Sequence, residues 1–131
     1  VTTPEVSSIR DADRVIGLLE AAELAIPNLI INRLRPGMVK QGDMMDKKDI
    51  MELLSVRMLG LVPDDDQIIV ATNRGVPAVH DQKSWSGEAF RRIAARLDGE
   101  DVPFLDLQSS QKLVSRIKRL MHLGGKGFSD D

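Results

Sequence analysis

The sequence predicts an α/β fold, namely half of a doubly wound parallel sheet with helices on both faces. Two observations lead to this prediction. Strand and helix signals alternate along the 131 residues, and the strand candidates at residues 29–32 and 58–62 are almost wholly apolar. Such apolar runs are typical of parallel strands that are buried on both faces. With 42% apolar and 29% charged residues, the composition is that of a soluble globular domain.

The first residues have the pattern of the end of a buried strand. Residues 1–3 are extended in character, and Pro4 ends the ladder because it donates no hydrogen bond. Ser7 or Ser8 then caps a helix that we expect to run from Ser8 to Ala25. A core strand needs neighbours on both sides, so we expect the sequence to be the C-terminal part of a larger protein. The helix has an apolar face made of Ile9, Ala12, Ile16 and Leu19.

Capping residues mark the elements that follow the first strand candidate. Residues 33–37 contain the chemistry of a turn, and Asp46 is placed to cap a second helix. After the strand at 58–62, which Pro63 closes, residues 64–66 offer three aspartates as caps for a short helix. We expect that helix to end at Arg74, with Gly75 as its C-cap and residues 76–79 extended. The second helix has apolar residues at Ile50, Met51, Leu53 and Leu54.

The last third of the sequence predicts a long helix, a linker and a tail. Ser84 or Ser86 begins the helix, which ends at residues 98–99. Residues 99–110 have the composition of a linker, held to the domain by Phe104 and Leu105. We therefore divide the chain into a domain at 1–98, a linker at 99–110 and a tail at 111–131, with a final helix at about 111–123. The apolar positions of the long helix are Ala89, Phe90, Ile93, Ala94 and Leu97.

Polar or conformationally restricted residues follow both central strand candidates. In open α/β sheets, ligands bind beyond the carboxyl ends of the strands. The carboxamide of Asn32 has donor and acceptor atoms, so it can pair with the amino group and a ring nitrogen of adenine together. Pro63 is placed to pack against a base. The simpler alternative, which the spacing alone favours, is that Asn32 caps a turn and Pro63 only ends a strand.

Several kinds of chemistry have no counterpart in the sequence. The chain has no Cys and only two distant His, which argues against a metal site, and its net charge of −2 provides no general attraction for nucleic acid. No apolar run approaches the roughly 18 residues of a membrane span. We find no GxxxxGK[ST] loop for phosphate, no Ser-His-Asp grouping and no carboxylate pair arranged for acid–base work. The chain thus offers a base pocket without phosphoryl-transfer machinery.

Three long strings in this chain resemble the C-terminal half of the septum site-determining MinD ATPases. They are TTPEVSSIRDADR, NRLRPGMVKQGDMM and LGLVPDDDQIIVATNRGVPAV, and they occur in the family's order over residues 1 to 123. The resemblance implies a deviant P-loop ATPase with a Rossmann-like fold. It further implies an ATP-bound homodimer that docks on membranes and positions the division site of bacteria or plastids.

The resemblance assigns a nucleotide-binding role to the two strand ends. Its cofactor is ATP with Mg²⁺, whose phosphate and metal ligands would lie upstream of this chain. We accordingly expect no ATPase activity from this chain alone, although the intact parent protein would be an ATP hydrolase. The residues matched to the adenine-binding positions of the family are Asn32, Arg33, Pro63 and Asp64.

The resemblance also assigns surfaces for self-association and for partners. Pro4 and Glu5 match the stretch at the dimer face near the nucleotide. Ser7, Asp11 and Asp13 match the exposed helix start that binds a MinC-like inhibitor and a MinE-like activator. From the residues alone, Asp11 and Asp13 instead complement the helix dipole in the first turns.

The tail has the pattern of an amphipathic helix that lies on an anionic membrane. Its apolar residues cover an arc of about 120°, and the charges within the helix are all basic. The alternatives are a packed C-terminal helix and a helix that binds a protein partner. The family often ends in an aromatic-rich stretch, whereas here Gly124 and Gly125 interrupt the helix and Phe128 is alone. The expected membrane-binding residues are Leu113, Val114, Arg116, Ile117, Lys118, Arg119, Leu120 and Met121.

Two other functions compete with the one that the resemblance implies. A ParA-like partitioning ATPase has the same fold and would carry DNA or other cargo. A non-catalytic peripheral membrane adaptor would need this half-fold to be stable by itself. For the leading function we expect no nucleic-acid partner. We expect a peripheral location on the cytoplasmic face of a bacterial inner membrane, or in the plastid stroma and on its inner envelope membrane.

Overall fold

The computed structural model describes residues 1–107, whose centre is a pair of parallel strands. These are β1 (Leu29–Leu34) and β2 (Met58–Pro63). A parallel pair needs a crossover between its strands, and here the crossover contains two helices. The parallel sheet that the apolar runs predicted is confirmed.

The start of the chain continues the sheet on the far side of β1. Thr2 forms an isolated parallel bridge with Ile31. Its N–H donates to the carbonyl of Ile30 at 3.0 Å, and its carbonyl accepts from the N–H of Asn32 at 2.8 Å. The strand expected at residues 1–3 is therefore present as this single bridge, and β1 lies between Thr2 and β2.

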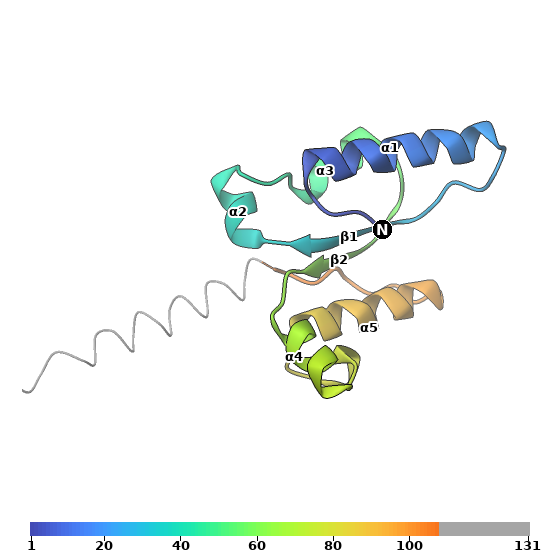
Figure 1. Ribbon diagram of the computed structural model, residues 1–131. Helices are drawn as coiled ribbons and strands as arrows, with labels where there is room; N and C mark the ends of the chain where they lie inside the picture. Colours follow the sequence, from blue (N-terminus) through green and yellow to red (C-terminus); the bar gives the residue numbers. More distant parts are fainter. Residues whose placement is uncertain (108–131) are drawn as a thin grey trace, which may run out of the picture.

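Helices cover both faces of the strand pair, as the doubly wound prediction requires. In Figure 1, α1 and α3 lie on one side of β1 and β2, and α4 and α5 lie on the other. No helix within residues 1–107 is long and apolar enough to cross a bilayer. The helical segments are α1 (Val6–Ala21), α2 (Pro36–Gln41), α3 (Lys47–Leu54), α4 (Gln67–Arg74), η1 (Ala78–His80) and α5 (Trp85–Leu97).

Alternate side chains of the strands form two separate cores. Ile31 packs with α1 and α3, where Ile50 is also fully buried. On the opposite face, Val62 packs against Ala89 and Ile93 of α5. Because each fully buried aliphatic side chain contributes roughly 1.5–3 kcal/mol, both layers of helices are held mainly by these contacts.

Several predicted caps are confirmed in atomic detail. Asp46 begins α3 with a reciprocal capping box, in which Asp46 and Asp49 each accept from the other's backbone N–H. Ser84 caps α5 by accepting from the N–H of Gly87 at 3.0 Å. Gly75 ends α4 with a left-handed φ of 67°.

Other boundaries differ from the prediction for local reasons. The first helix ends at Ala21 and not at Ala25, because Glu23 adopts a left-handed φ of 55°. Its N-cap position is held by Glu5 without a side-chain hydrogen bond, and not by Ser7 or Ser8. Ser8 instead accepts a hydrogen bond from the hydroxyl of Thr3.

The prediction that residues 33–37 form a turn is also wrong at both of its ends. The strand β1 continues to Leu34, and Pro36 then begins the short helix α2, because its fixed φ suits the first helical position. Residues 76–79, expected to be extended, instead lead into the 3₁₀ turn of η1.

Residues 99–107 have no helix or strand but are fastened to the domain. Arg96 donates to the carbonyls of Val102 at 3.0 Å and Leu59 at 2.9 Å. The ring of Phe104 lies 3.7 Å from the Lys47 ammonium and 4.1 Å from the Arg96 guanidinium. Phe104 and Leu105 also pack against the core, as expected. The predicted helix at 111–123 and the amphipathic tail lie outside the described residues.

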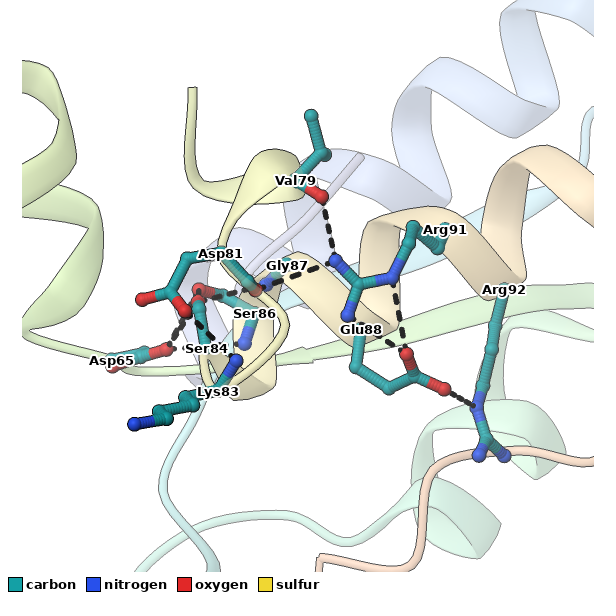
Figure 2. Close-up of polar contacts among 10 residues, drawn as sticks. All are labelled: Asp65, Val79, Asp81, Lys83, Ser84, Ser86, Gly87, Glu88, Arg91 and Arg92. Carbon is teal, nitrogen blue, oxygen red and sulfur yellow. Dashed lines mark hydrogen bonds and ion pairs between the residues drawn. The ribbon is translucent and has the colours of Figure 1, made fainter. Parts of the chain in front are cut away.

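Glu88 organises two arginines of α5. It accepts from Arg91 at 2.9 Å and from Arg92 at 2.7 Å. These arginines in turn donate to carbonyls of η1 and of the 99–107 segment, as Figure 2 shows for Val79. Hydrogen bonds from Arg92 and Arg91 hold the pKa of Glu88 below its ordinary value of 4.5. Glu88 is therefore a charged carboxylate near neutral pH.

We predict that Glu88→Gln weakens the acid dependence of stability. A lowered folded-state pKa contributes stability that is complete above pH 4.5 and is lost as the pH falls through the folded value. Since the pairs are partly exposed, the loss at pH 7 should be only about 0.5–1 kcal/mol. Urea unfolding of the parent and the variant at pH 7 and pH 3.5 checks this. If the free energy of unfolding falls by the same amount between the two pH values in both proteins, the prediction is wrong.

We predict that Gly60→Ala destabilises the sheet–helix contact. A Cβ at Gly60 would overlap with Cγ1 and Cδ1 of Ile93 on α5. Overpacking of this kind costs about 1–3 kcal/mol, measurable by chemical denaturation. The matched control is Gly17→Ala in α1, where a Cβ meets nothing within 4 Å. The control should stabilise the protein by about 0.5–1 kcal/mol through helix propensity, and equal effects of the two changes would refute the account.

Candidate functional site

The carboxyl ends of β1 and β2 lie side by side, which brings two predicted site segments together. Past the last residues of the strands, the N–H of Asp64 donates to the carbonyl of Leu34 at 2.9 Å. The ladder thus extends to the first residue of the loop between β2 and α4. Ligands of open α/β sheets bind at this edge.

Two arginines that follow β1 face the carboxylate that follows β2. The Nε atoms of Arg33 and Arg35 lie 3.6 and 2.5 Å from the two carboxylate oxygens of Asp64. The Asp64 side chain is 29% exposed, and both arginines are more than half exposed. The group carries a net charge of +1 and contains several donors, which suits a polar ligand with acceptor atoms.

Arg33 has an unusual backbone conformation. Its φ is +58°, in the left-handed region that residues with a Cβ seldom occupy. Its N–H donates to the side-chain oxygen of Asn32 at 2.9 Å, which supports the turn. Asn32 therefore has the local turn-capping contact that the simpler alternative anticipated, and its role toward adenine stays a prediction. Strain of this kind is concentrated at functional sites.

A cavity of about 580 Å³ joins Arg33 to the start of the chain. Pro4 and Glu5 line it together with Arg33 and Arg35. The predicted dimer face and one of the predicted adenine residues thus share one hollow. Asn32 lies apart from it, in a cavity of about 450 Å³ that Asp11 also lines. Pro63 is buried as the last residue of β2.

Sequence reasoning missed a hydrogen-bonded cluster next to this site. Asp65, which the sequence suggested only as a helix cap, accepts from the hydroxyls of Ser84 and Ser86 at 3.0 and 2.8 Å (Figure 2). Burial raises the pKa of Asp65, but hydrogen bonds from Gln67, Ser86 and Ser84 outweigh burial and hold the pKa below its ordinary value. The available signal was the Ser-x-Ser pattern at 84–86, whose connection to Asp65 exists only in the fold.

The predicted partner residues lie on the exposed side of α1. Ser7, Asp11 and Asp13 are exposed, while Ile9 and Ile16 face the core. Asp11 is 3.5 Å from Arg14 on the next turn, a solvent-exposed pair that contributes little to stability. Because α1 begins at Val6 and has no acidic residue in its first turn, the dipole role considered for Asp11 and Asp13 is not confirmed.

Within residues 1–107, no cluster of three or more His, Asp or Glu side chains is suited to a metal ion. Asp64 and Asp65 instead use their carboxylates on arginines and hydroxyls. The predicted membrane-binding residues of the tail lie outside the described part of the chain.

Comparison with known proteins points to one group. No family model matches. The chain is 52% identical over 127 residues to the septum site-determining protein MinD of Synechocystis, covering 95% of this chain and 47% of the relative. It is 47% identical over 120 residues to MinD of Bacillus subtilis, covering 90% of this chain and 45% of that protein. The chain spans about half the length of the curated relatives it matches.

Solved structures show the same similarity. The MinD cell division protein of Aquifex aeolicus matches with a TM-score of 0.77 and 43% identity over 80% of this chain and 44% of that one. A MinC:MinD complex from the same organism matches with the same score and identity, covering 43% of its chain. MinD of Pyrococcus horikoshii in complex with Mg-ADP matches with a TM-score of 0.65 and 30% identity, over 75% of this chain and 39% of that one.

We predict that position 33 tolerates Gly but not Val. At a φ of +58°, Arg33→Val places a β-branched side chain in a strained conformation and should cost about 1–3 kcal/mol. Arg33→Gly removes the same exposed ion pair yet relieves the strain, so stability should stay within about 1 kcal/mol of the parent. Denaturant unfolding of both variants checks this, and similar losses in the two would show that Arg33 is not strained.

Proposed function

Because this chain belongs to the MinD family, of which it corresponds to a C-terminal portion, we propose that its protein places the division site as an ATP-dependent switch. In the proposed cycle, the ATP-bound protein forms a homodimer, binds an anionic membrane and recruits a MinC-like division inhibitor. ATP hydrolysis, stimulated by a MinE-like activator, then releases it. The location would be the cytoplasmic face of a bacterial inner membrane, or the plastid stroma and inner envelope membrane.

The observation that carries this proposal is the meeting of Arg33 with Asp64 at the carboxyl ends of adjacent parallel strands. This edge is where a doubly wound sheet binds its ligand. We assign Arg33 and Asp64 to the base of ATP on this geometry. Asn32, which lines a different cavity from Arg33, and Pro63, which is buried in β2, are assigned to it on the family resemblance. An amide, a proline ring and backbone groups suit a flat, neutral base with donors and acceptors on its edge.

The phosphates need groups that this chain does not supply. Its sequence contains no GxxxxGK[ST] loop, and no metal-binding cluster occurs among the described residues. When bound, Mg-ATP would supply the phosphoryl group whose transfer to water drives the cycle. This chain would bind and orient the base, and we propose that alone it neither binds ATP tightly nor hydrolyses it.

Self-association and partner binding would use the surfaces next to the base. Pro4 and Glu5 share a cavity with Arg33, so a dimer contact there would be sensitive to the nucleotide. Ser7, Asp11 and Asp13 are exposed on α1, which begins just after Pro4 and Glu5. The MinC:MinD complex from Aquifex aeolicus supports a MinC-like partner for this protein.

Membrane binding would depend on the tail and on dimerisation together. A partly buried apolar face, with about 1 kcal/mol from each basic residue, must offset the cost of ordering the helix. One copy therefore binds weakly. Two copies on one dimer gain a factor of about 10²–10⁴ by avidity. ATP would thus switch membrane binding on without any change in the tail itself.

We predict that the complete protein sediments with anionic vesicles in ATP and remains soluble in ADP. Ile117→Glu puts a charge into the apolar arc of the predicted helix and should weaken this binding roughly tenfold or more. Ser115→Glu, which adds the same charge on the opposite face of that helix, is the matched control and should have a much smaller effect. Equal sedimentation in ATP and ADP, or equal losses in the two variants, would overturn the proposed switch.

A further inference from the structure

The turn after β2 carries two adjacent carboxylates that contact different parts of the fold. Asp64 faces Arg33 and Arg35, which follow β1. Asp65 contacts Ser84 and Ser86 at the start of α5, about twenty positions further along the chain. Figure 2 shows Asp65 beside these two serines. Asp65 therefore attaches the loop that contains Asp64 to the start of α5.

The contacts that the structure defines for the Asp65 carboxylate are all hydrogen bonds that it accepts from N–H or O–H groups. One oxygen accepts from the Ser84 hydroxyl at 3.0 Å, the Ser86 hydroxyl at 2.8 Å and the Ser86 N–H at 3.1 Å. The other accepts from the N–H of Gln67 at 3.0 Å. Ser84 is 1% exposed and Ser86 is fully buried. Charge-assisted hydrogen bonds to buried donors are about twice as strong as neutral ones, so this is a firm attachment.

The start of α5, to which Asp65 is attached, is itself fixed. The Ser84 hydroxyl accepts from the N–H of Gly87 and so caps the helix. Gly87 lies so close to η1 that a Cβ there would overlap with the carbonyl oxygen of Ala78. Further along α5, Ile93 packs directly on Gly60 of β2. Asp65 therefore joins the loop to a rigid element.

The contacts on the other side of the loop are weaker. Arg33 and Arg35 are both more than half exposed, and exposed ion pairs contribute about 0–1 kcal/mol each. They add little to the strand ladder, in which Pro63 pairs with Leu34 and the N–H of Asp64 donates to the Leu34 carbonyl at 2.9 Å. The hydrogen bonds of Asp65 are less weakened by solvent than these ion pairs, because its serine partners are buried.

We propose that Asp65 is a positioning residue, which sets the selectivity of the site for adenine by fixing the loop at Asp64 beyond the point where the strand ladder ends. The inference rests on the proposed function, since it assumes that the base binds at this edge. In this proposal Asp65 acts through the loop and not by contact with the nucleotide. Loosening the loop lowers the discrimination between adenine and guanine, because discrimination requires that the groups which contact the edge of the base stay in place.

The test measures the affinities of the complete protein for ADP and GDP by competition against a fluorescent ADP. Asp65→Asn keeps the shape of the side chain but removes its charge and half of its acceptor capacity. We expect it to reduce the ratio of the two dissociation constants roughly five- to tenfold. Asp66→Asn, the same change at the exposed neighbouring N-cap position, should leave the ratio within about twofold of the parent.

Two further variants separate the possible failures. Asn32→Ala tests the adenine site directly; an unchanged ratio there overturns both the proposed site and this inference. If Asn32→Ala lowers the ratio but Asp65→Asn does not, the proposed function stands and the inference is wrong. If Asp65→Asn does not fold, Ser86→Ala, which removes one hydrogen bond to Asp65, decides. A lowered ratio supports the inference and an unchanged ratio overturns it.

Discussion

The parallel pairing of β1 with β2 is the constraint on which the other features of this chain depend. Parallel strands place both carboxyl ends at one edge, so Arg35 and Asp64, 29 positions apart, meet there without a direct turn between the strands. The same pairing leaves two apolar faces, which α1 and α3 cover on one side and α5 covers on the other. The candidate site is thus a consequence of how the apolar strands are buried.

The two sides of that edge differ: the loop after β2 is supported by buried contacts, whereas the end of β1 is strained and exposed. Buried apolar contacts such as Ile93 on Gly60 set the position of α5, and the Asp65 cluster transmits that position to the loop after β2. On the β1 side, Arg33 is held at a positive φ and is exposed to solvent. The loop proposed to bind the base is thus well supported, whereas the arginines are exposed and can be rearranged at little cost.

The sequence was sufficient to predict features that depend on local chemistry, such as helix caps, or on the pattern of apolar residues along the chain. Apolar runs identified both strands, and capping residues identified α3 and α5. It did not predict α2, because that six-residue helix buries no side chain and leaves no apolar period to detect. It also missed the Asp65–Ser86 bond, because tertiary packing alone brings the two residues together. The MinD resemblance is confirmed by the relatives, and the proposed function is drawn from that family and not from the fold.

We propose that the carboxyl ends of β1 and β2 hold the base of the nucleotide. Photolabelling the complete protein with 8-azido-ADP, followed by peptide mass spectrometry, tests it most directly, because the reactive group is attached to the base. The account predicts a label within residues 32–35 or 63–66 that excess ADP suppresses. Labelling that ADP suppresses, but that falls on neither segment, would contradict it.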